Sequence, residues 1–168
     1  MSTLGQPEPH ATYRKLTTLA ESREAIDEVI AAAQKTLSIF DYNLAQRGYG
    51  SVARIEKLRH FLLAGRAHRL RIALHEPEYL ERHEPRLIAL LRSLPASIEI
   101  HRTVGQALNA TDPFVVADDH SVWHLQHHDQ PLAIVALHSP ADASPLRERF
   151  EEIWELSESA IGVSTTGL

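Results

Sequence analysis

The stretch Ala110-Thr111-Asp112-Pro113-Phe114-Val115-Val116-Ala117-Asp118-Asp119 decides the fold, because a short apolar run lies in it between two polar segments. The run at 114–117 is typical of a buried strand. Asp118 and Asp119 favour a turn directly after it. Further apolar runs at 122–125 and 132–137 follow within a few residues, and such close spacing favours antiparallel pairs of strands.

Upstream of this stretch, amphipathic helices alternate with short apolar strands. Expected strands occupy residues 37–40, 70–74 and 98–101, and expected helices begin at the candidate caps Ser22 and Ser51 and at Pro77. Pro85 interrupts the third helix, which it should kink or divide, and the last helix is expected to begin near Ser144-Pro145. Strands that alternate with helices indicate parallel βαβ units. The sequence therefore predicts an α/β fold with a mixed, mostly parallel sheet and helices on both faces.

Length and composition fit one globular domain. The chain has 168 residues, of which 43% are hydrophobic and 23% charged, enough for a sizeable core. The first and the last residues are too polar or too interrupted to pack. We therefore expect a disordered N-terminal segment at 1–15, the folded domain at 16–160 and a flexible C-terminal tail at 161–168.

Composition also excludes or disfavours several classes of protein. The chain has no cysteine, which excludes disulfides, thiolate metal ligands and thiol catalysis. The formal net charge of −5 argues against nucleic acid as a partner. No apolar run approaches eighteen residues, and the first residues lack the pattern of a signal peptide. We therefore expect no membrane insertion and a cytoplasmic location.

The order of elements across residues 22–159 is similar to one half of a phospholipase D-like protein. The motif of that superfamily is His-x-Lys followed by four residues and Asp, on a strand that ends in a turn. On this pattern Thr111 stands at the histidine position, Pro113 at the lysine position and Asp118 at the aspartate position. The resemblance implies a phospholipase D-like half with a degenerate motif, in which Asp118 caps the turn after its strand.

In active members of this superfamily the histidine attacks phosphorus and the lysine holds the phosphate oxygens. Thr111 has no partnered base in the sequence, and Pro113 has neither a positive charge nor a backbone N–H. The resemblance therefore implies a non-catalytic binding or assembly module. Because the superfamily builds its cleft from two halves, it also implies a homodimer as one candidate assembly. A protein partner is a second candidate, and a monomer whose former cleft has become a surface is the competing interpretation.

Polar residues follow each of the three leading strands. In an open α/β sheet, ligands bind outside the carboxyl ends of parallel strands. These ends carry the ligand-binding candidates Asp41, Tyr42, His75, Glu76, His101 and Arg102. Such a set could form an acid/base pair or a small anion site, which leaves a phosphodiesterase or another hydrolase as an alternative function. Strand ends are also simply where polar residues occur.

Eleven histidines are an unusual number for this length. His120, His124 and His128 are the metal candidates, because an extended strand followed by a turn could bring three imidazoles to one zinc ion. Exposed hairpin histidines are the alternative, and no cofactor is expected otherwise. Full protonation of the histidines would move the formal charge from −5 to +6, so a pH-responsive regulator is a further alternative.

Overall fold

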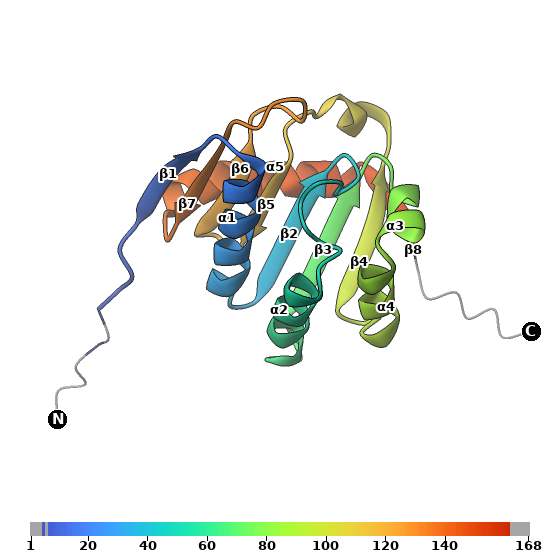
Figure 1. The fold of residues 1–168 in the computed structure, drawn as a ribbon, viewed down its shortest axis with the longest axis horizontal. Helices are drawn as coiled ribbons and strands as arrows, with labels where there is room; N and C mark the ends of the chain where they lie inside the picture. Colours follow the sequence, from blue (N-terminus) through green and yellow to red (C-terminus); the bar gives the residue numbers. More distant parts are fainter. Residues whose placement is uncertain (1–4, 6, 162–168) are drawn as a thin grey trace, which may run out of the picture.

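The structure is a computed structural model that describes Gly5 and residues 7–161, and a sheet runs through the whole of this part (Figure 1). Over the described residues the sheet has eight strands in the order β1-β7-β6-β5-β2-β3-β4-β8. Their bounds are β1 (Thr12–Leu16), β2 (Thr36–Asp41), β3 (Arg69–Leu74), β4 (Ile98–Thr103), β5 (Phe114–Ala117), β6 (Ser121–Leu125), β7 (Ala133–Leu137) and β8 (Ser157–Ile161).

The direction of the strands corrects one prediction. Only the pairs β2–β3 and β3–β4 are parallel, while the five pairs β1–β7, β2–β5, β4–β8, β5–β6 and β6–β7 are antiparallel. The expectation of a mostly parallel sheet is therefore wrong. The two parallel pairs come from the helix-linked strands, whereas short turns join β5, β6 and β7 and enforce antiparallel pairing. Ile39 of β2 lies where the two arrangements meet, because it pairs with Ile72 on one side and Val115 on the other.

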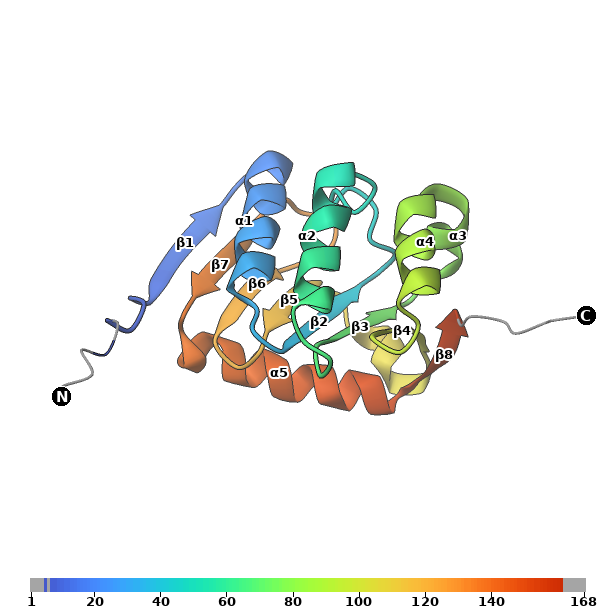
Figure 2. The same cartoon turned by 90° about the horizontal axis from the view of Figure 1, so that it is seen from below.

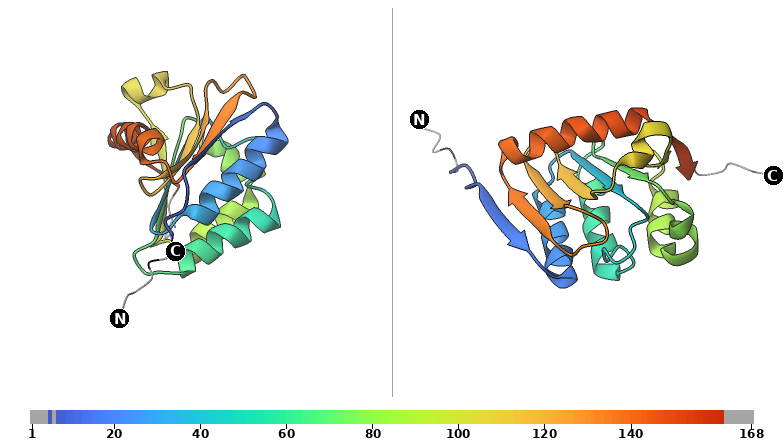
Figure 3. Two further views of the ribbon diagram at one scale, coloured as in Figure 1. Left: turned by 90° about the vertical axis from the view of Figure 1, so that its left-hand side faces the viewer. Right: turned by 90° about the horizontal axis from the view of Figure 1, so that it is seen from above.

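Helices cover both faces of the sheet, as predicted. Figure 2 shows α1 (Leu19–Ala32), α2 (Val52–Leu63) and α4 (Pro85–Ser93) side by side on one face, with the short α3 (Glu78–His83) beside α4. The long helix α5 (Pro140–Glu155) crosses the other face, and the short 3₁₀ helix η1 (Gly105–Asn109) lies on the same side (Figure 3). None of the helices in the described part of the chain is both long and apolar enough to cross a membrane.

The alternation of side chains along β6 divides the core into two layers. Trp123, which is 1% exposed, packs with Leu125 on the side of α1 and α2, and Val122 packs with Phe150 on the side of α5. The indole Nε1 of Trp123 donates to the hydroxyl of Ser22 at 3.1 Å. Trp123 therefore packs under α1. Ser22 is not the cap of that helix: α1 begins three residues earlier, and Thr18 caps it.

The expectation for the N-terminal segment is wrong for Thr12–Lys15. These residues belong to β1, which pairs antiparallel with β7 and forms one edge of the sheet. Four of the five residues of β1 are exposed, so the strand has no apolar signature by which its sequence could reveal it. Backbone hydrogen bonds hold it in place, and every residue except proline has both the N–H and the carbonyl that such bonds need.

The C-terminal part begins and ends differently from the expectation. Helix α5 starts at Pro140, so that Pro145 lies inside the helix rather than at its first turn. After α5 the chain forms β8, which pairs antiparallel with β4 at the other edge of the sheet. Ile161 therefore ends a strand, and the rest of the expected tail at 161–168 lies outside the described residues. The prediction that Pro85 divides the third helix is confirmed, because α3 ends at His83 and α4 begins at Pro85.

Candidate functional site at the loop end of the central strands

Several loops meet where β2 and β3 end, at the upper edge of the molecule in Figure 1. The ring of Tyr42 lies edge-on to His75, with centroids 5.3 Å apart, and it stacks on His128 at 5.4 Å. The backbone N–H of His128 donates to the carbonyl of Thr111 at 3.0 Å. These contacts join the ends of β2 and β3, the segment before β5 and the loop after β6. We call this surface the rim, defined by residues 42, 75, 111–112, 124, 127–129 and 149.

The three residues that the resemblance aligned with the superfamily motif lie at different places. Thr111 is exposed on the rim, and Pro113 is buried directly before β5. Asp118 lies at the opposite end of β5, where its carboxylate accepts the backbone N–H groups of Gln34, Lys35 and Thr36 at 2.7, 2.9 and 2.9 Å. Asp118 therefore joins the turn before β2 to the turn after β5, a structural contact remote from the rim.

The side chains of Arg149 and His124 hold Asp112, which lies between Thr111 and Pro113. Both terminal nitrogens of Arg149 donate to its carboxylate, and Nε2 of His124 lies 2.8 Å from it. Burial would raise the pKa of Asp112, but the hydrogen bonds from His124 and Arg149 outweigh it and lower the pKa to about 2. The charge of Asp112 is thus neutralised within the chain.

Sequence reasoning missed both Asp112 and Arg149 as residues of the site. The sequence did hold a signal for Asp112, because this residue lies between Thr111 and Pro113 in the stretch that the resemblance singled out. Arg149 had none: its place on the rim depends on how α5 crosses the sheet. His124 was expected to bind a metal ion, and the structure places it on Asp112 instead.

His75 has partners for both of its ring nitrogens. Nε2 lies 2.7 Å from the carbonyl oxygen of Ala110, and Nδ1 lies 2.5 Å from the hydroxyl of Thr103. A carbonyl oxygen only accepts, so Nε2 must donate to Ala110, while Nδ1 is paired with Thr103, whose hydroxyl also donates to the carbonyl of Leu74 at 3.4 Å. Phe40 and Tyr42 contact the ring edge-on at 5.3 Å each. The imidazole is therefore fixed in position, and a substrate would have to displace Thr103 or Ala110 to reach either ring nitrogen.

Asp41 lies beneath the rim, 3% exposed. Its carboxylate accepts from Nε of Arg47 at 2.9 Å and from the backbone N–H of Tyr42 at 2.6 Å. Burial raises the pKa of Asp41, although the nearby positive charge of Arg47 opposes this rise. The guanidinium of Arg47 lies over the ring of Trp123 at 5.3 Å. Asp41 therefore belongs to the buried support of the rim rather than to its surface.

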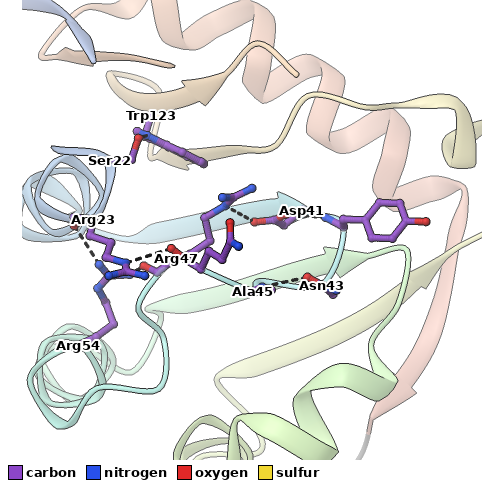
Figure 4. A network of polar contacts seen from close by, with 10 residues as sticks. Ser22, Arg23, Asp41, Asn43, Ala45, Arg47, Arg54 and Trp123 are labelled. Atoms are coloured by element: carbon purple, nitrogen blue, oxygen red, sulfur yellow. Dashed lines mark hydrogen bonds and ion pairs between the residues drawn. The ribbon is translucent and has the colours of Figure 1, made fainter. Parts of the chain in front are cut away.

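A second buried arginine extends this support (Figure 4). The two terminal nitrogens of Arg54 donate to the backbone carbonyls of Arg47 and Arg23, each at 3.0 Å, and Nε donates to Asp27 at 2.5 Å. Arg54 thereby ties α1, α2 and the loop after β2 together. Leu44 and Gln46 of that loop have φ of 68° and 66°, a left-handed conformation that non-glycine residues adopt only when contacts such as these hold the loop.

The other rim candidates lie apart from Tyr42 and His75. His101 stacks on Trp154 of α5, with centroids 3.6 Å apart, and burial lowers the pKa of His101. Arg102 pairs with Glu78 of α3, and Glu76 is exposed. Neighbouring residues of a strand point to opposite faces, so His101 and Arg102 cannot both face one ligand.

The three histidines expected to share a metal ion do not converge. His120 precedes β6, where it stacks with His138 at 5.4 Å and lies near Asp118, whereas His128 follows β6 at the far end. His124 lies on Asp112. A different group gathers in the loop after β6: one ligand atom from each of His127, His128 and Asp129 lies within 4.8 Å of the others.

Comparisons with known proteins agree on the fold. A family model described as "Domain of unknown function (DUF7931)" matches residues 18–163. Nuc from Salmonella typhimurium, described as a phospholipase D family member, has a TM-score of 0.59 and 12% identity over 90% of this chain and 99% of Nuc. NucT from Helicobacter pylori has a TM-score of 0.61 and 10% identity over 90% of this chain and all of NucT. At such identities the likeness shows a phospholipase D-like fold.

A third similar structure belongs to a longer protein. TrmBL2, described as an archaeal chromatin protein with a novel mode of DNA binding, has a TM-score of 0.63 and 15% identity over 94% of this chain. The match covers 56% of TrmBL2, so this chain spans little more than half of that protein. Comparison with curated protein sequences gave no significant match.

Proposed function

The chain belongs to the family described as Domain of unknown function (DUF7931), and from its phospholipase D-like fold and the residues of its rim we propose that it is a non-catalytic binding or assembly module. The observation that carries the proposal is the pairing of His75. Thr103 and Ala110 engage both of its ring nitrogens, and Thr103, the hydroxyl that this imidazole could activate, is 1% exposed and so shielded from a substrate.

Other residues on and beneath the rim support the same proposal. The resemblance aligns Thr111 and Pro113 with the nucleophile and the phosphate-binding lysine of the superfamily. The carboxylates of Asp41 and Asp112 are each paired with an arginine, Arg47 and Arg149. Paired groups of this kind hold a surface in one shape, which suits recognition better than proton transfer.

The experiment is a turnover assay with three phosphodiesters: bis(p-nitrophenyl) phosphate, a single-stranded oligonucleotide and phosphatidylcholine vesicles. We expect no hydrolysis above that of buffer, and the same result for the His75→Asn variant. A thermal-shift series with inorganic phosphate, nucleotides and oligonucleotides tests the binding part, because a ligand of the native state raises its apparent stability. Hydrolysis that the wild type shows and His75→Asn lacks would overturn the proposal.

One observation favours a second candidate function, a phosphodiesterase that uses His124. Its Nε2 lies 2.8 Å from Asp112, an arrangement that orients an imidazole whose other nitrogen could attack phosphorus or accept a proton. The bidentate contact of Asp112 with Arg149 argues against this second candidate, because Arg149 compensates the negative charge that would otherwise act on the imidazole of His124. Turnover abolished by His124→Ala and retained in His120→Ala would favour this second candidate.

For the assembly part we propose a homodimer, as in the two-half architecture of the superfamily, with a different protein as the alternative partner. Sedimentation equilibrium from 1 to about 100 μM would distinguish the two. A mass that rises to twice 18.8 kDa supports the homodimer. A mass that stays at 18.8 kDa over this range would refute it.

A further inference from the structure

The loop between β6 and β7 places two imidazoles and one carboxylate on the rim. Nε2 of His128 lies 2.9 Å from one carboxylate oxygen of Asp129, and Nδ1 of His127 lies 3.5 Å from the other. The two imidazole rings stack on each other with centroids 4.7 Å apart. All three side chains reach solvent, so a dissolved ion has access to them.

These separations match the edges of a small coordination polyhedron. Bonds of about 2.0 to 2.1 Å to nitrogen and oxygen in a tetrahedral zinc site place neighbouring ligand atoms about 3.4 Å apart. The observed 2.9 and 3.5 Å lie on either side of this value. The three ligand atoms lie within 4.8 Å of one another, so rotation of the exposed side chains would bring them to one ion.

The backbone and Tyr42 already hold the loop in this shape. The N–H of His128 donates to the carbonyl of Thr111 at 3.0 Å, and the N–H of Gln130 donates to the carbonyl of His127 at 3.1 Å. Tyr42 stacks on the ring of His128 with an interplanar angle of 17°. A site that is ordered before binding loses less conformational entropy when the ion arrives.

We propose that His127, His128 and Asp129 bind a divalent transition-metal ion of the zinc class, with Tyr42 as the residue that positions His128. Two imidazoles and one carboxylate form a ligand set that zinc accepts, and they leave a fourth position open to water or to an anion. The ion would add positive charge to the rim beside Thr111. This proposal does not depend on whether the rim is catalytic.

The experiment measures metal binding directly on the chelator-treated full chain. Co²⁺ is titrated first, because its visible spectrum reports its coordination geometry, and Zn²⁺ is then added in competition. We expect one ion per chain, displaced by Zn²⁺. We also expect at least a tenfold loss of affinity in His128→Ala and in Asp129→Asn, since each removes one of three ligands. Tyr42→Leu should weaken binding by a smaller factor and leave the Co²⁺ spectrum unchanged in form.

The chain provides its own matched control. His120 and His138 also stack, at 5.4 Å, but no carboxylate of the described residues joins both of them in a three-ligand group. His120→Ala should therefore bind Co²⁺ like the wild type. Equal affinity in His128→Ala, an equal loss in His120→Ala, or unchanged affinity in urea-unfolded chain would each overturn the proposal, the last because it would show chelation by two adjacent histidines without the fold.

Discussion

The pairing of Asp112 with Arg149 and His124 makes a quantitative prediction about stability. In the Asp112→Asn variant the side chain keeps its size but loses its charge and one of its two acceptor oxygens, so Arg149 and His124 lose the carboxylate that both of them bind. The pKa of Asp112 is lowered from 3.8 to about 2 in the folded chain. At about 1.36 kcal/mol per pKa unit this shift corresponds to roughly 2 kcal/mol of folding free energy at neutral pH.

The sign of the pH dependence follows from the direction of the shift. A carboxyl whose pKa is lower in the folded state stabilises that state above the unfolded pKa, and the stabilisation disappears as the pH falls through the folded pKa. For Asp112 the full effect is present above pH 4, about half of it remains at pH 3, and little remains below pH 2. The difference in free energy of unfolding between the wild type and Asp112→Asn should become smaller over the same pH interval.

The assay is urea unfolding followed by circular dichroism at pH 7, 5 and 3. The free energy of unfolding of Asp112→Asn should lie about 2 kcal/mol below that of the wild type at pH 7 and about 1 kcal/mol below it at pH 3. Asp119→Asn is the matched control. Its carboxylate is 65% exposed, and its contact with Arg147 is long, at 3.9 Å. The substitution should therefore change the free energy of unfolding by less than about 0.5 kcal/mol.

Two results would refute this reasoning. A difference at pH 7 no larger than that of the Asp119→Asn control would mean that Arg149 and His124 contribute nothing through the carboxylate charge. A difference that stays constant from pH 7 to pH 3 would assign the loss to packing or to neutral hydrogen bonds. Either result would also remove the argument that the charge of Asp112 is neutralised on the rim.

Three further substitutions test the supports of the fold by the same urea assay. Asp118→Ala removes the acceptor of three backbone N–H groups and should cost about 1 to 3 kcal/mol; an unchanged midpoint would contradict its structural role. Ser22→Ala leaves the indole N–H of Trp123 without its acceptor and should cost about 1 kcal/mol, whereas a neutral effect would mean that water replaces the hydroxyl. Arg47→Met leaves Asp41 buried and unpaired and should cost about 3 to 5 kcal/mol. Arg47→Met combined with Asp41→Leu should recover much of that loss, and a double variant no more stable than the single one would contradict the ion-pair argument.

The parts of the fold that follow from local patterns could be read from the sequence. The interruption of the third helix at Pro85 and the close pairing of β5, β6 and β7 were predictable, because both effects depend on a few neighbouring residues. The direction of the sheet was not predictable in this way. It depends on which strands pair, and β5 lies beside β2 in the structure although the chain between them forms two other strands.

The edge strands and several contacts of the site depend on tertiary structure, and for this reason they could not be predicted from local sequence. In β1 four of five side chains are exposed, so pairing with β7 is decided by backbone hydrogen bonds that leave no trace in composition. On the rim, Tyr42 and His75 lie together as strand ends in a parallel pair should. The contact of Asp112 with Arg149 spans 37 residues, and it depends on where α5 crosses the sheet, which helical periodicity does not specify.

Both edge strands of the sheet pair with strands that lie far away in the sequence. β1 pairs with β7, so that Thr12 lies opposite Leu137, and β8 is the last described strand of the chain. During synthesis on a ribosome, β1 and β8 cannot pair with their partners until nearly all of the described chain has emerged. In contrast, β2 and β3 are separated only by α2 and its loops and can pair early. Contacts of long sequence separation form slowly. In pulse-labelled hydrogen exchange during refolding, the amides of β2 and β3 should therefore become protected before those of β1. The central strands would form first, and the edge strands β1 and β8 would be added last.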